Sequence, residues 1–516
     1  MKEQMITVPA SAAGTRLSVW LAGNGYPVTA DCGGKGTCGK CRIRVLSGTF
    51  YSDATGSGIE TPDADGMIRS CHAWCSDSGA VLCLTETVGG GLTEVAVNPA
   101  PAQHISGGRT GAKHFGTALD IGTTTLAMAL VDMNSGEAVN TVSRRNPQRS
   151  FGADVMSRIG AVSEDEENLF VMQSILLDEI RSMTEELCAG LVDASMPDRL
   201  SVAGNTTMLH LFCGISPAGM GAYPFTPAFL DSKTFAGSDL GLPFDTVTVT
   251  PGAHAFIGGD VTAGVLLLRL SDAREPVMLI DIGTNGEMVL FTGTEHGGQF
   301  IAASAAAGPA LEGAGISTGV GGITGAVSSA QEVNGQIAVR TIGDKPPVGI
   351  CGSGLIDLAA ILLARGDLDE TGYLEEDPFL YAVTEDGTPL TLTQEDVRAL
   401  QLAKSAMRAG MEALCDAADI PLTALSRVYV AGGLGYYMNM DSAAAIGLLP
   451  KELRTKLVSV GNTSLGGASL LLYDPSLSER IAAEAAAYQT VDLNRSAAFN
   501  EGFITHMMFP SDEEDW

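Results

Sequence analysis

The sequence lacks an apolar run long enough to cross a membrane, because no uninterrupted hydrophobic segment reaches ~18 residues. The first 23 residues are broken by polar side chains and glycine, unlike the continuous apolar core of a secretory signal peptide. We therefore expect a cytoplasmic protein without a membrane partner.

Basic residues are also scarce. The chain has 30 lysines and arginines against 60 aspartates and glutamates, which gives a formal net charge of −30. A nucleic-acid-binding protein requires a positively charged surface, and anionic membranes attract basic segments in the same way. The charge balance argues against both classes of partner and leaves small ligands or other proteins.

Glycine, in contrast, is abundant, with 63 among 516 residues, above the usual ~7%. No Gly-X-Y period is present, which excludes a collagen-like chain. The excess predicts many tight loops in which the backbone approaches a ligand closely. The length predicts about two to four domains.

Six of the ten cysteines lie within the first 83 residues. In a reducing compartment such clustering favours metal binding over disulfides. Cys32, Cys38 and Cys41 follow a C-x5-C-x2-C spacing on one glycine-rich segment, and Cys71 comes later in the chain. Three thiolates on one loop and a fourth from afar are typical of a plant-type [2Fe–2S] cluster, here with a longer first gap.

Two points about these cysteines stay open at this stage. A zinc site is the main alternative to the cluster, although zinc ribbons usually pair two C-x2-4-C knuckles. Cys71 is the expected fourth ligand, and Cys75 and Cys83 are its alternatives.

An internal repeat marks the larger, C-terminal part of the chain. Asp120-Ile-Gly-Thr recurs as Asp281-Ile-Gly-Thr, each time between two apolar, strand-like segments. Such a loop suits phosphate binding, because glycine permits close backbone approach and the N–H and hydroxyl groups donate to phosphate oxygens. The expected phosphate contacts are Gly122, Thr123, Thr124, Thr125, Gly283, Thr284 and Asn285.

The loops are not a Walker A motif, because no GxxxxGK[ST] is present. Asp120 and Asp281 are candidate ligands of a hydrated Mg²⁺ or candidate water-positioning carboxylates. Alternatively, each carboxylate only caps its own turn. A third glycine element at 428–435 runs from a buried-type strand into Gly432 and Gly433, and is expected to form the adenosine site.

Two helices can be placed from local patterns. Apolar residues at helical spacing predict a helix within 164–191. Thr393 with Asp396 forms a capping-box pattern that predicts a helix start.

The first part of the chain resembles the ferredoxin β-grasp. The three glycine elements together resemble the acetate and sugar kinase/Hsc70/actin superfamily, whose ATPases have two RNase H-like halves. The resemblances imply an α/β protein with a ferredoxin-like domain at 1–95, a linker at 96–114, a first ATPase half at 115–272 and a second at 273–516.

The combination resembles the reductive activators of corrinoid enzymes. The resemblance covers nearly the whole chain and is carried by long strings that include NPQRSFGADVMSRI (146–159), AGNTTMLHLF (203–212) and GICGSGLIDL (349–358). One departure is visible, because only the short 96–114 segment separates the ferredoxin and ATPase parts, which restricts how the cluster reaches a partner. No C-terminal cysteine cluster is present, so the chain resembles the [2Fe–2S] branch of the family.

The resemblance implies an anaerobic enzyme that uses a [2Fe–2S] cluster, ATP and Mg²⁺ to reduce Co(II) to Co(I) in a corrinoid protein of a methyltransferase system. It implies a low-potential electron donor and a possible homodimer. Cys32, Cys38, Cys41 and Cys71 would bind the cluster.

The resemblance also assigns roles around the nucleotide. Asp260, at an expected helix start, would orient the attacking water, with simple N-capping as the alternative. Lys404 would face adenine or lie in solvent. The 302–322 stretch would contact the corrinoid partner or only allow close packing.

Other functions stay open on the sequence alone. One is a small-molecule kinase of the same superfamily with an appended ferredoxin domain, although no sugar or acid pocket stands out. A second is an activator of another low-potential enzyme. A third is an electron-transfer or scaffold protein with decayed nucleotide loops, against which the intact Asp-Ile-Gly-Thr copies argue.

Overall fold

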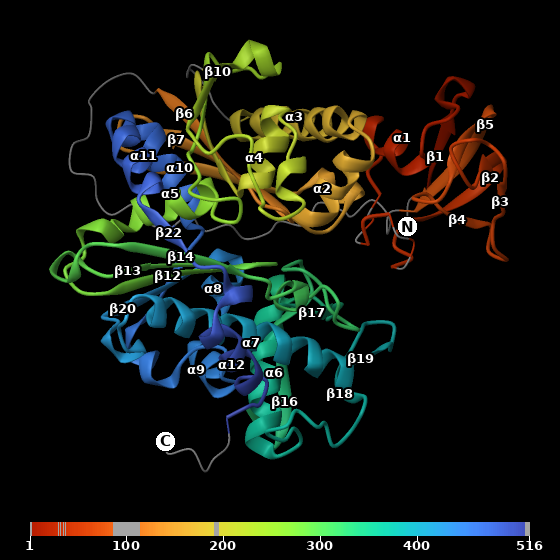
Figure 1. Ribbon diagram of the computed structural model, residues 1–516. Coiled ribbons are helices and arrows are strands. Elements are labelled where there is room, and N and C mark those ends of the chain that lie inside the picture. The colour runs from red at the N-terminus through yellow and green to blue at the C-terminus, as the bar shows by residue number, and fades with distance from the viewer. Residues whose placement is uncertain are drawn as a thin grey trace. The chain divides into compact units, whose positions relative to one another are not determined.

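The computed structural model of the protein describes residues 3–28, 30, 32–34, 36, 38–85, 114–189 and 196–510 (Figure 1). The predicted linker 96–114, apart from its last residue, lies outside the described residues. The chain divides into two compact units. The first contains the described residues up to Leu130 and Val139–Val249, and the second contains Val131–Ala138 and the described residues from Thr250 onward.

The first unit begins with a small sheet and one helix. The sheet has the strand order β1-β5-β2-β3, with β4 paired to β2, and β1 runs antiparallel to β5. Its apolar side chains, such as Ile6, Val8 and Leu82, are buried together with Leu17 and Leu21 of the helix. The elements are β1 (Glu3–Val8), α1 (Leu17–Gly23), β2 (Arg42–Tyr51), β3 (Ile59–Glu60), β4 (Met67–Arg69) and β5 (Trp74–Thr85).

A six-stranded sheet follows, with the strand order β10-β11-β9-β6-β7-β8. Strand β9 runs parallel to both β6 and β11, and β10 is an antiparallel edge strand. The strands are β6 (Phe115–Ile121), β7 (Thr125–Asp132), β8 (Ala138–Arg145), β9 (Arg199–Gly204), β10 (Lys233–Ala236) and β11 (Thr246–Val249). The helical segments are η2 (Pro147–Phe151), α2 (Val155–Glu164), α3 (Glu167–Cys188), α4 (Thr206–Cys213) and the short η3 (Ala218–Met220) and η4 (Gly237–Leu240).

The small sheet and the six-stranded sheet of the first unit are in direct contact. Val19 and Ala22 of α1 pack into the apolar cluster that contains Val171 of α3. Arg16, which precedes α1, lies 3.9 Å from the carboxylate of Glu164 (Arg16 Nη1 to Glu164 Oε2). The contacts made by α1 and by Arg16 both lie within the first compact unit.

The second unit contains another six-stranded sheet, of order β21-β20-β12-β13-β14-β22. Its strands are β12 (Val277–Ile282), β13 (Gly286–Phe291), β14 (Phe300–Ala305), β20 (Arg427–Ala431), β21 (Leu457–Gly461) and β22 (Tyr488–Thr490). Two smaller sheets contain β15 (Ala326–Val333), β16 (Gln336–Thr341), β17 (Gly349–Ile350), β18 (Phe379–Val383) and β19 (Pro389–Leu392).

Alternation along β12 divides the core of this unit between the two faces of the sheet. Met278 and Ile280 pack with residues of α6 and α7, whereas Val277 and Leu279 pack with residues of α5, as the two-residue period of a strand requires. Figure 1 shows α5, α10 and α11 on one side of this sheet and α6, α7, α9 and α12 on the other. The helices are α5 (Gly259–Leu268), α6 (Gly352–Arg365), α7 (Gln394–Ala417), α8 (Gly432–Tyr437), α9 (Met440–Ala445), α10 (Thr463–Tyr473), α11 (Ser478–Ala486) and α12 (Ala497–Thr505).

Five strands of the two six-stranded sheets have matching topologies, as the internal repeat predicts, whereas the sixth strands, β10 and β22, lie at opposite edges. In each, a strand bearing the Asp-Ile-Gly-Thr copy pairs with the next strand in the chain, and its other neighbour is parallel: β9 beside β6, and β20 beside β12. A further parallel strand follows in both sheets, β11 and β21 respectively. The chain therefore contains two α/β halves of one design.

Both local helix predictions are confirmed. Helix α3 spans Glu167–Cys188, inside the predicted range. At the start of α7 the Thr393 side chain accepts from the Asp396 backbone N–H, and the Asp396 carboxylate accepts from that of Thr393.

Candidate functional site

The four predicted cluster cysteines lie close together in two pairs. The sulfurs of Cys32 and Cys38 are 3.4 Å apart, and those of Cys41 and Cys71 are 3.2 Å apart. The thiols of Cys32 and Cys38 also lie near enough to Cys71 to raise its pKa, after the larger effects of Cys41 and burial. Two thiol pairs fit a cluster of two irons, each with two cysteine ligands.

The two alternative ligands lie elsewhere on the small sheet. Cys75 is fully buried on β5 opposite Phe50, where burial raises the pKa of its thiol to about 12. Cys83 is buried farther along β5, opposite Met5 on β1. In contrast, the hydrogen bond with Cys71 lowers the pKa of the Cys41 thiol to about 6. Cys41 therefore forms the thiolate that a metal requires more readily than Cys75 does.

The cluster loop depends on left-handed glycines. Gly36 has φ +71°, and a Cβ at this position would lie 2.4 Å from Nε2 of His72. Gly39 has a similar φ of +68°, but a Cβ there would meet none of the described atoms within 4 Å. Only at Gly36, therefore, would a side chain strain the backbone and also collide with the segment that carries Cys71.

This difference predicts how the cluster responds to two matched substitutions. Left-handed backbone costs about 1–2 kcal/mol for a non-glycine residue, and Gly36→Ala adds the collision with His72. We expect Gly36→Ala to release its cluster to a chelator a few-fold faster than Gly39→Ala, and less than the tenfold that ~1.4 kcal/mol would give, because the exposed His72 ring can turn aside. Bleaching of the visible absorption measures the rate, and equal rates would show that the His72 contact is unimportant.

The first predicted phosphate loop joins β6 to β7 in a tight turn. The N–H of Gly122 donates to the carbonyl of Thr125 at 3.0 Å, and a Cβ on Gly122 would lie 2.5 Å from that oxygen. Asn146 holds the loop by donating from its side chain to the Gly122 carbonyl at 2.8 Å and from its N–H to the Thr124 carbonyl at 2.9 Å. Asn205 donates to the Thr123 hydroxyl at 2.9 Å.

A buried cation lies behind this loop. Arg158 is fully buried and donates to the carbonyls of Thr123 at 2.5 Å and Gly152 at 3.1 Å. Burial lowers the pKa of its guanidinium to about 9, so the side chain still carries its charge at neutral pH. The loop contains no lysine, and Arg158 supplies a positive charge in direct contact with its backbone.

The second predicted phosphate loop, between β12 and β13, is surrounded by carboxylates. The N–H of Gly283 donates to the carbonyl of Asn285 at 3.0 Å, and the Thr284 hydroxyl donates to Glu312 at 2.7 Å. Glu312 belongs to the 302–322 stretch, so this stretch packs against the loop. A Cβ on Gly313 would lie 2.1 Å from the Val320 carbonyl, so the stretch is closely packed here, and its contact with a corrinoid partner stays a prediction.

The diglycine turn also lies at this second loop. Ala431 on β20 is opposite Asp281 on β12, and Gly432 follows with φ +87°. A Cβ on Gly432 would lie 2.7 Å from Oδ1 of Asp281 and 2.8 Å from the carbonyl of Ile282. The structure therefore brings Gly432 and Asp281 into contact, and Gly433 follows at the start of α8.

Three carboxyl groups gather at the end of β12. Asp281 is directly opposite Glu287 on β13, and the Ser304 hydroxyl on β14 donates to Glu287 at 3.3 Å. Burial and the charges of Asp260 and Asp281 raise the pKa of Glu287 well above its usual range. Asp260 lies in the first turn of α5, whose N-cap is Gly258, so Asp260 is not the N-cap residue. Its carboxylate still accepts from the first-turn N–H of Val261 at 2.8 Å.

Two acidic residues near the second loop, Glu287 and Glu312, are absent from the predicted site. Glu287 is two residues beyond Asn285 in the IDIGTNGEM string. If the strands on either side of the loop pair with each other, Asp281 and Glu287 become cross-strand neighbours. Glu312 is far away in the chain, and only the fold brings it to Thr284.

Both interpretations of Lys404 are wrong, because its side chain is only 1% exposed. The ammonium donates to the carbonyls of His506 at 2.5 Å and Met508 at 2.6 Å and lies 4.8 Å from the ring centroid of Phe509. Lys404 therefore fastens the segment after α12 to α7. Burial, with a smaller contribution from Arg408, lowers the pKa of Lys404 to about 7.

The lowered pKa of Lys404 predicts a pH-dependent stability. The unfolded chain holds this proton up to about pH 10.4, whereas the folded chain releases it near pH 7, so burial of Lys404 costs stability below pH 7 and this cost shrinks as pH rises between these values. From pH 7 to 9, we expect the unfolding free energy of the protein to rise relative to Lys404→Met by at most about 1.4 kcal/mol per pH unit. Urea titrations measure this, with Lys451→Met as the control, and parallel pH profiles for the protein and Lys404→Met would contradict it.

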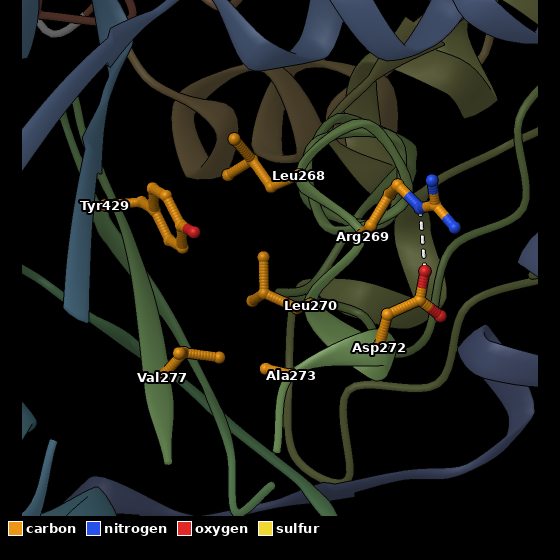
Figure 2. A pocket seen from close by; sticks show the side chains of 7 residues that line it. All are labelled: Leu268, Arg269, Leu270, Asp272, Ala273, Val277 and Tyr429. Atoms are coloured by element: carbon orange, nitrogen blue, oxygen red, sulfur yellow. Dashed lines mark hydrogen bonds and ion pairs between the residues drawn. The ribbon is translucent and has the colours of Figure 1, made fainter. Parts of the chain in front are cut away.

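A cavity of about 340 Å³ lies away from these loops (Figure 2). Arg269 and Asp272 at its rim form an ion pair of 2.7 Å (Nε to Oδ2). Val277 begins β12 whereas Asp281 lies near its end, which separates the cavity from the second loop by roughly 13 Å at ~3.3 Å per residue. We therefore assign no nucleotide to it. Its lining residues are Leu268, Arg269, Leu270, Asp272, Ala273, Val277 and Tyr429.

Thiol pairs on a ferredoxin-like sheet, followed by two matching α/β halves with glycine loops, define an iron–sulfur protein with an ATPase of the actin and sugar-kinase class. Three family descriptions match successive parts of the chain. They are "2Fe-2S iron-sulfur cluster binding domain" at residues 2–75, "RACo middle region" at 115–273, and "C-terminal domain of RACo the ASKHA domain" at 275–516.

The relatives agree with these matches. The chain is 33% identical over 422 residues to "Corrinoid activation enzyme RamQ" of Eubacterium limosum, covering 77% of this chain and 70% of that protein. It is 27% identical over 433 residues to "[Co(II) methylated amine-specific corrinoid protein] reductase" of Methanosarcina barkeri, covering 77% of each. A solved structure, "Reductive activator for corrinoid,iron-sulfur protein", matches with a TM-score of 0.71 and 27% identity, over 98% of this chain and 96% of that one.

The chain belongs to the RACo family of reductive corrinoid activators. The predicted family and the predicted α/β fold class are confirmed. Within the described ranges, none of the helices has the length and apolar character needed to span a membrane.

Proposed function

We propose that this protein reduces the cobalt of a partner corrinoid protein from Co(II) to Co(I) in an ATP-dependent reaction. The observation that carries the proposal is the presence, in one chain, of two thiol pairs and two glycine phosphate loops. Support also comes from the relatives, since one is named a corrinoid activation enzyme and another a Co(II) corrinoid protein reductase.

The amino-terminal thiols would hold a [2Fe–2S] cluster, which supplies one-electron transfer when bound. Cys32 and Cys38 would bind one iron, and Cys41 and Cys71 the other, because their sulfurs form these pairs. The left-handed glycines keep side chains out of the loop, so that backbone N–H groups can approach the sulfurs.

The nucleotide would be held by the two glycine loops. Gly122 through Thr125 and Gly283 through Asn285 would donate to the phosphates, and Gly432 and Gly433 would accommodate the adenosine. Asp120 and Asp281 would bind Mg²⁺ through water. Asp260 would orient the attacking water, and Glu287 would keep a proton, which reduces the charge repulsion among these carboxyl groups.

The energetics give ATP a role. Plant-type clusters have potentials near about −400 mV. For a cobalt couple of lower potential, electron transfer is uphill, and each 59 mV costs a tenfold change in equilibrium constant. In the balanced step, one electron from an external low-potential donor reduces one Co(II) to Co(I), while ATP and water give ADP and phosphate. This coupling requires that the partner bind the nucleotide states with different affinities.

We further propose that the partner is a corrinoid protein of a methyltransferase system and that the protein works in an anaerobic cytoplasm as a homodimer. The net charge of −30 would favour a basic surface on the electron donor or on the corrinoid protein.

The test mixes the purified holoprotein, a low-potential chemical reductant, Mg-ATP and a Co(II) corrinoid protein under anaerobic conditions. We expect the visible spectrum of Co(I) to develop only when ATP is present. No Co(I), or equal Co(I) with and without ATP, would overturn the proposed function.

A further inference from the structure

One segment of the first unit contacts both the cluster loop and the first phosphate loop. We call residues 146–164, which contain η2 and α2, the bridging segment. It begins with Asn146 and includes Ser157 and Arg158 in consecutive positions on α2. All its contacts described below lie within the first compact unit.

On the nucleotide side, the bridging segment holds three successive carbonyls of the phosphate loop. Asn146 donates hydrogen bonds to the carbonyls of Gly122 and Thr124, and Arg158 donates to the carbonyl of Thr123. A loop whose carbonyls are held in this way cannot change its backbone conformation unless Asn146 and Arg158 move as well.

On the cluster side, the same segment touches the residues around Cys32. The N–H of Ala30 donates to the carbonyl of Arg149 in η2 at 3.3 Å. Gly33, with φ +60°, lies so close to α2 that a Cβ there would be 2.9 Å from both Cβ and Oγ of Ser157. The contact is therefore between backbone and a short side chain, with no flexible group between them.

Ser157 is confined on its other side as well. A Cβ on Gly152, which has φ +146°, would lie 2.3 Å from Cβ of Ser157. The Ser157 N–H donates to Asp154 at 2.7 Å. Close-packed groups of this kind transmit displacement because they have little room to absorb it.

We propose that the bridging segment couples the nucleotide loop to the cluster loop, with Arg158 and Ser157 as the two positioning residues. The proposal rests on the proposed function, because it takes nucleotide and cluster to occupy those loops. Nucleotide binding shifts the Gly122–Thr124 backbone, Arg158 and Asn146 follow, and Ser157 presses on Gly33 beside Cys32. By reciprocity, the redox state of the cluster changes the affinity for nucleotide.

The expected size follows from this reciprocity. Coupling between two sites is typically about fivefold or more in affinity. A fivefold difference in nucleotide affinity between the oxidised and reduced protein equals a shift of about 41 mV in cluster potential, at ~59 mV per tenfold for one electron. A shift of this size is measurable by redox titration followed by electron paramagnetic resonance.

The first measurement uses the full-length holoprotein. We expect a non-hydrolysable ATP analogue to move the cluster potential and its resonance signal. In hydrogen exchange, we expect it to change protection in the 30–41 loop together with residues 146–158. A potential and loop protection unchanged by saturating analogue would overturn the coupling.

Matched variants localise the effect. Ser157→Leu places a larger side chain between Gly33 and Gly152, and we expect it to keep nucleotide affinity in the oxidised state within about twofold but to lose the shift. Ser163→Leu makes the same change at an exposed position of the same helix and should keep the shift. Arg158→Lys cannot span the two carbonyls and should weaken both nucleotide binding and the shift.

The outcomes separate this proposal from the proposed function. Retention of the full shift in Ser157→Leu would overturn the coupling route. If Ser157→Leu does not fold, the wild-type potential and exchange results decide. ATP-dependent Co(I) formation with no nucleotide effect on the potential would leave the proposed function intact and overturn the coupling, whereas failure to bind nucleotide or cluster would overturn both.

Discussion

Replacing Cys71 with alanine is expected to abolish the visible absorption of the cluster and to reduce Co(I) formation below detection. The sulfur of Cys71 lies 3.2 Å from that of Cys41, and its loss would leave one iron with a single cysteine ligand from the protein. Clusters of this type require four protein ligands. Iron and sulfide content, measured on anaerobically purified protein, checks the prediction.

Cys75→Ala is the matched control for Cys71→Ala. Cys75 is four positions away and fully buried on β5, so its removal costs stability through lost packing but should leave the iron content unchanged. Nucleotide binding should survive in both variants, because neither substitution removes a residue of the phosphate loops. A normal cluster in Cys71→Ala, or a missing one in Cys75→Ala, would identify a different fourth ligand.

Asp281→Asn is expected to lower the ATP hydrolysis rate by about 100-fold or more, the scale on which a positioned proton-transfer or water-orienting group contributes. The change removes one negative charge beside Glu287, so the pKa of Glu287 should fall toward its usual range. The alkaline limb of the pH–rate profile, on which Glu287 would lose its proton, should therefore move to lower pH. Steady-state ATPase assays across pH measure both effects.

Asp272→Asn provides the control for Asp281→Asn. Asp272 is an exposed carboxylate of the same unit, paired with Arg269 and Arg480 at the rim of the cavity in Figure 2. Its loss should change the ATPase rate by less than about twofold. Cluster content should be normal in both variants, and an ATPase rate in Asp281→Asn within tenfold of wild type would remove Asp281 from the reaction.

Much of the fold was predictable because its information is local. The repeated Asp-Ile-Gly-Thr predicts two similar halves, and the matching orders of the two six-stranded sheets confirm it. The capping box at Thr393 depends on residues three apart. The domain boundaries at 95 and 272 stay a prediction. The contact of α1 with α3 was not foreseen, because half-buried Val19 shows no pattern that names its partner.

The candidate site was predictable only where chemistry and spacing coincide. Cysteine spacing indicates Cys32, Cys38 and Cys41. Only the fold distinguishes Cys71 from Cys75, because it places the Cys71 sulfur beside that of Cys41. The burial of Lys404 could not be anticipated, because its acceptors are backbone carbonyls about a hundred residues away. A backbone carbonyl has no signature in the sequence.

Arg158 and Glu312 were missed for a related reason. Each acts on a loop from a distant part of the chain, Arg158 through the Thr123 carbonyl and Glu312 through the Thr284 hydroxyl. Arg158 was visible inside the long NPQRSFGADVMSRI string, but only the fold shows it as a buried cation behind the loop.

The two halves share a strand order but not the same groups around their loops. Six positions after the aspartate of each repeat, the second half has Glu287 and the first has Leu126, which is fully buried. The first loop instead rests on the guanidinium of Arg158. The two loops therefore have opposite electrostatic surroundings, since one contacts a buried cation and the other lies among carboxyl groups. A glutamate at position 126 would therefore be buried in an apolar core, without the acidic neighbours that surround Glu287.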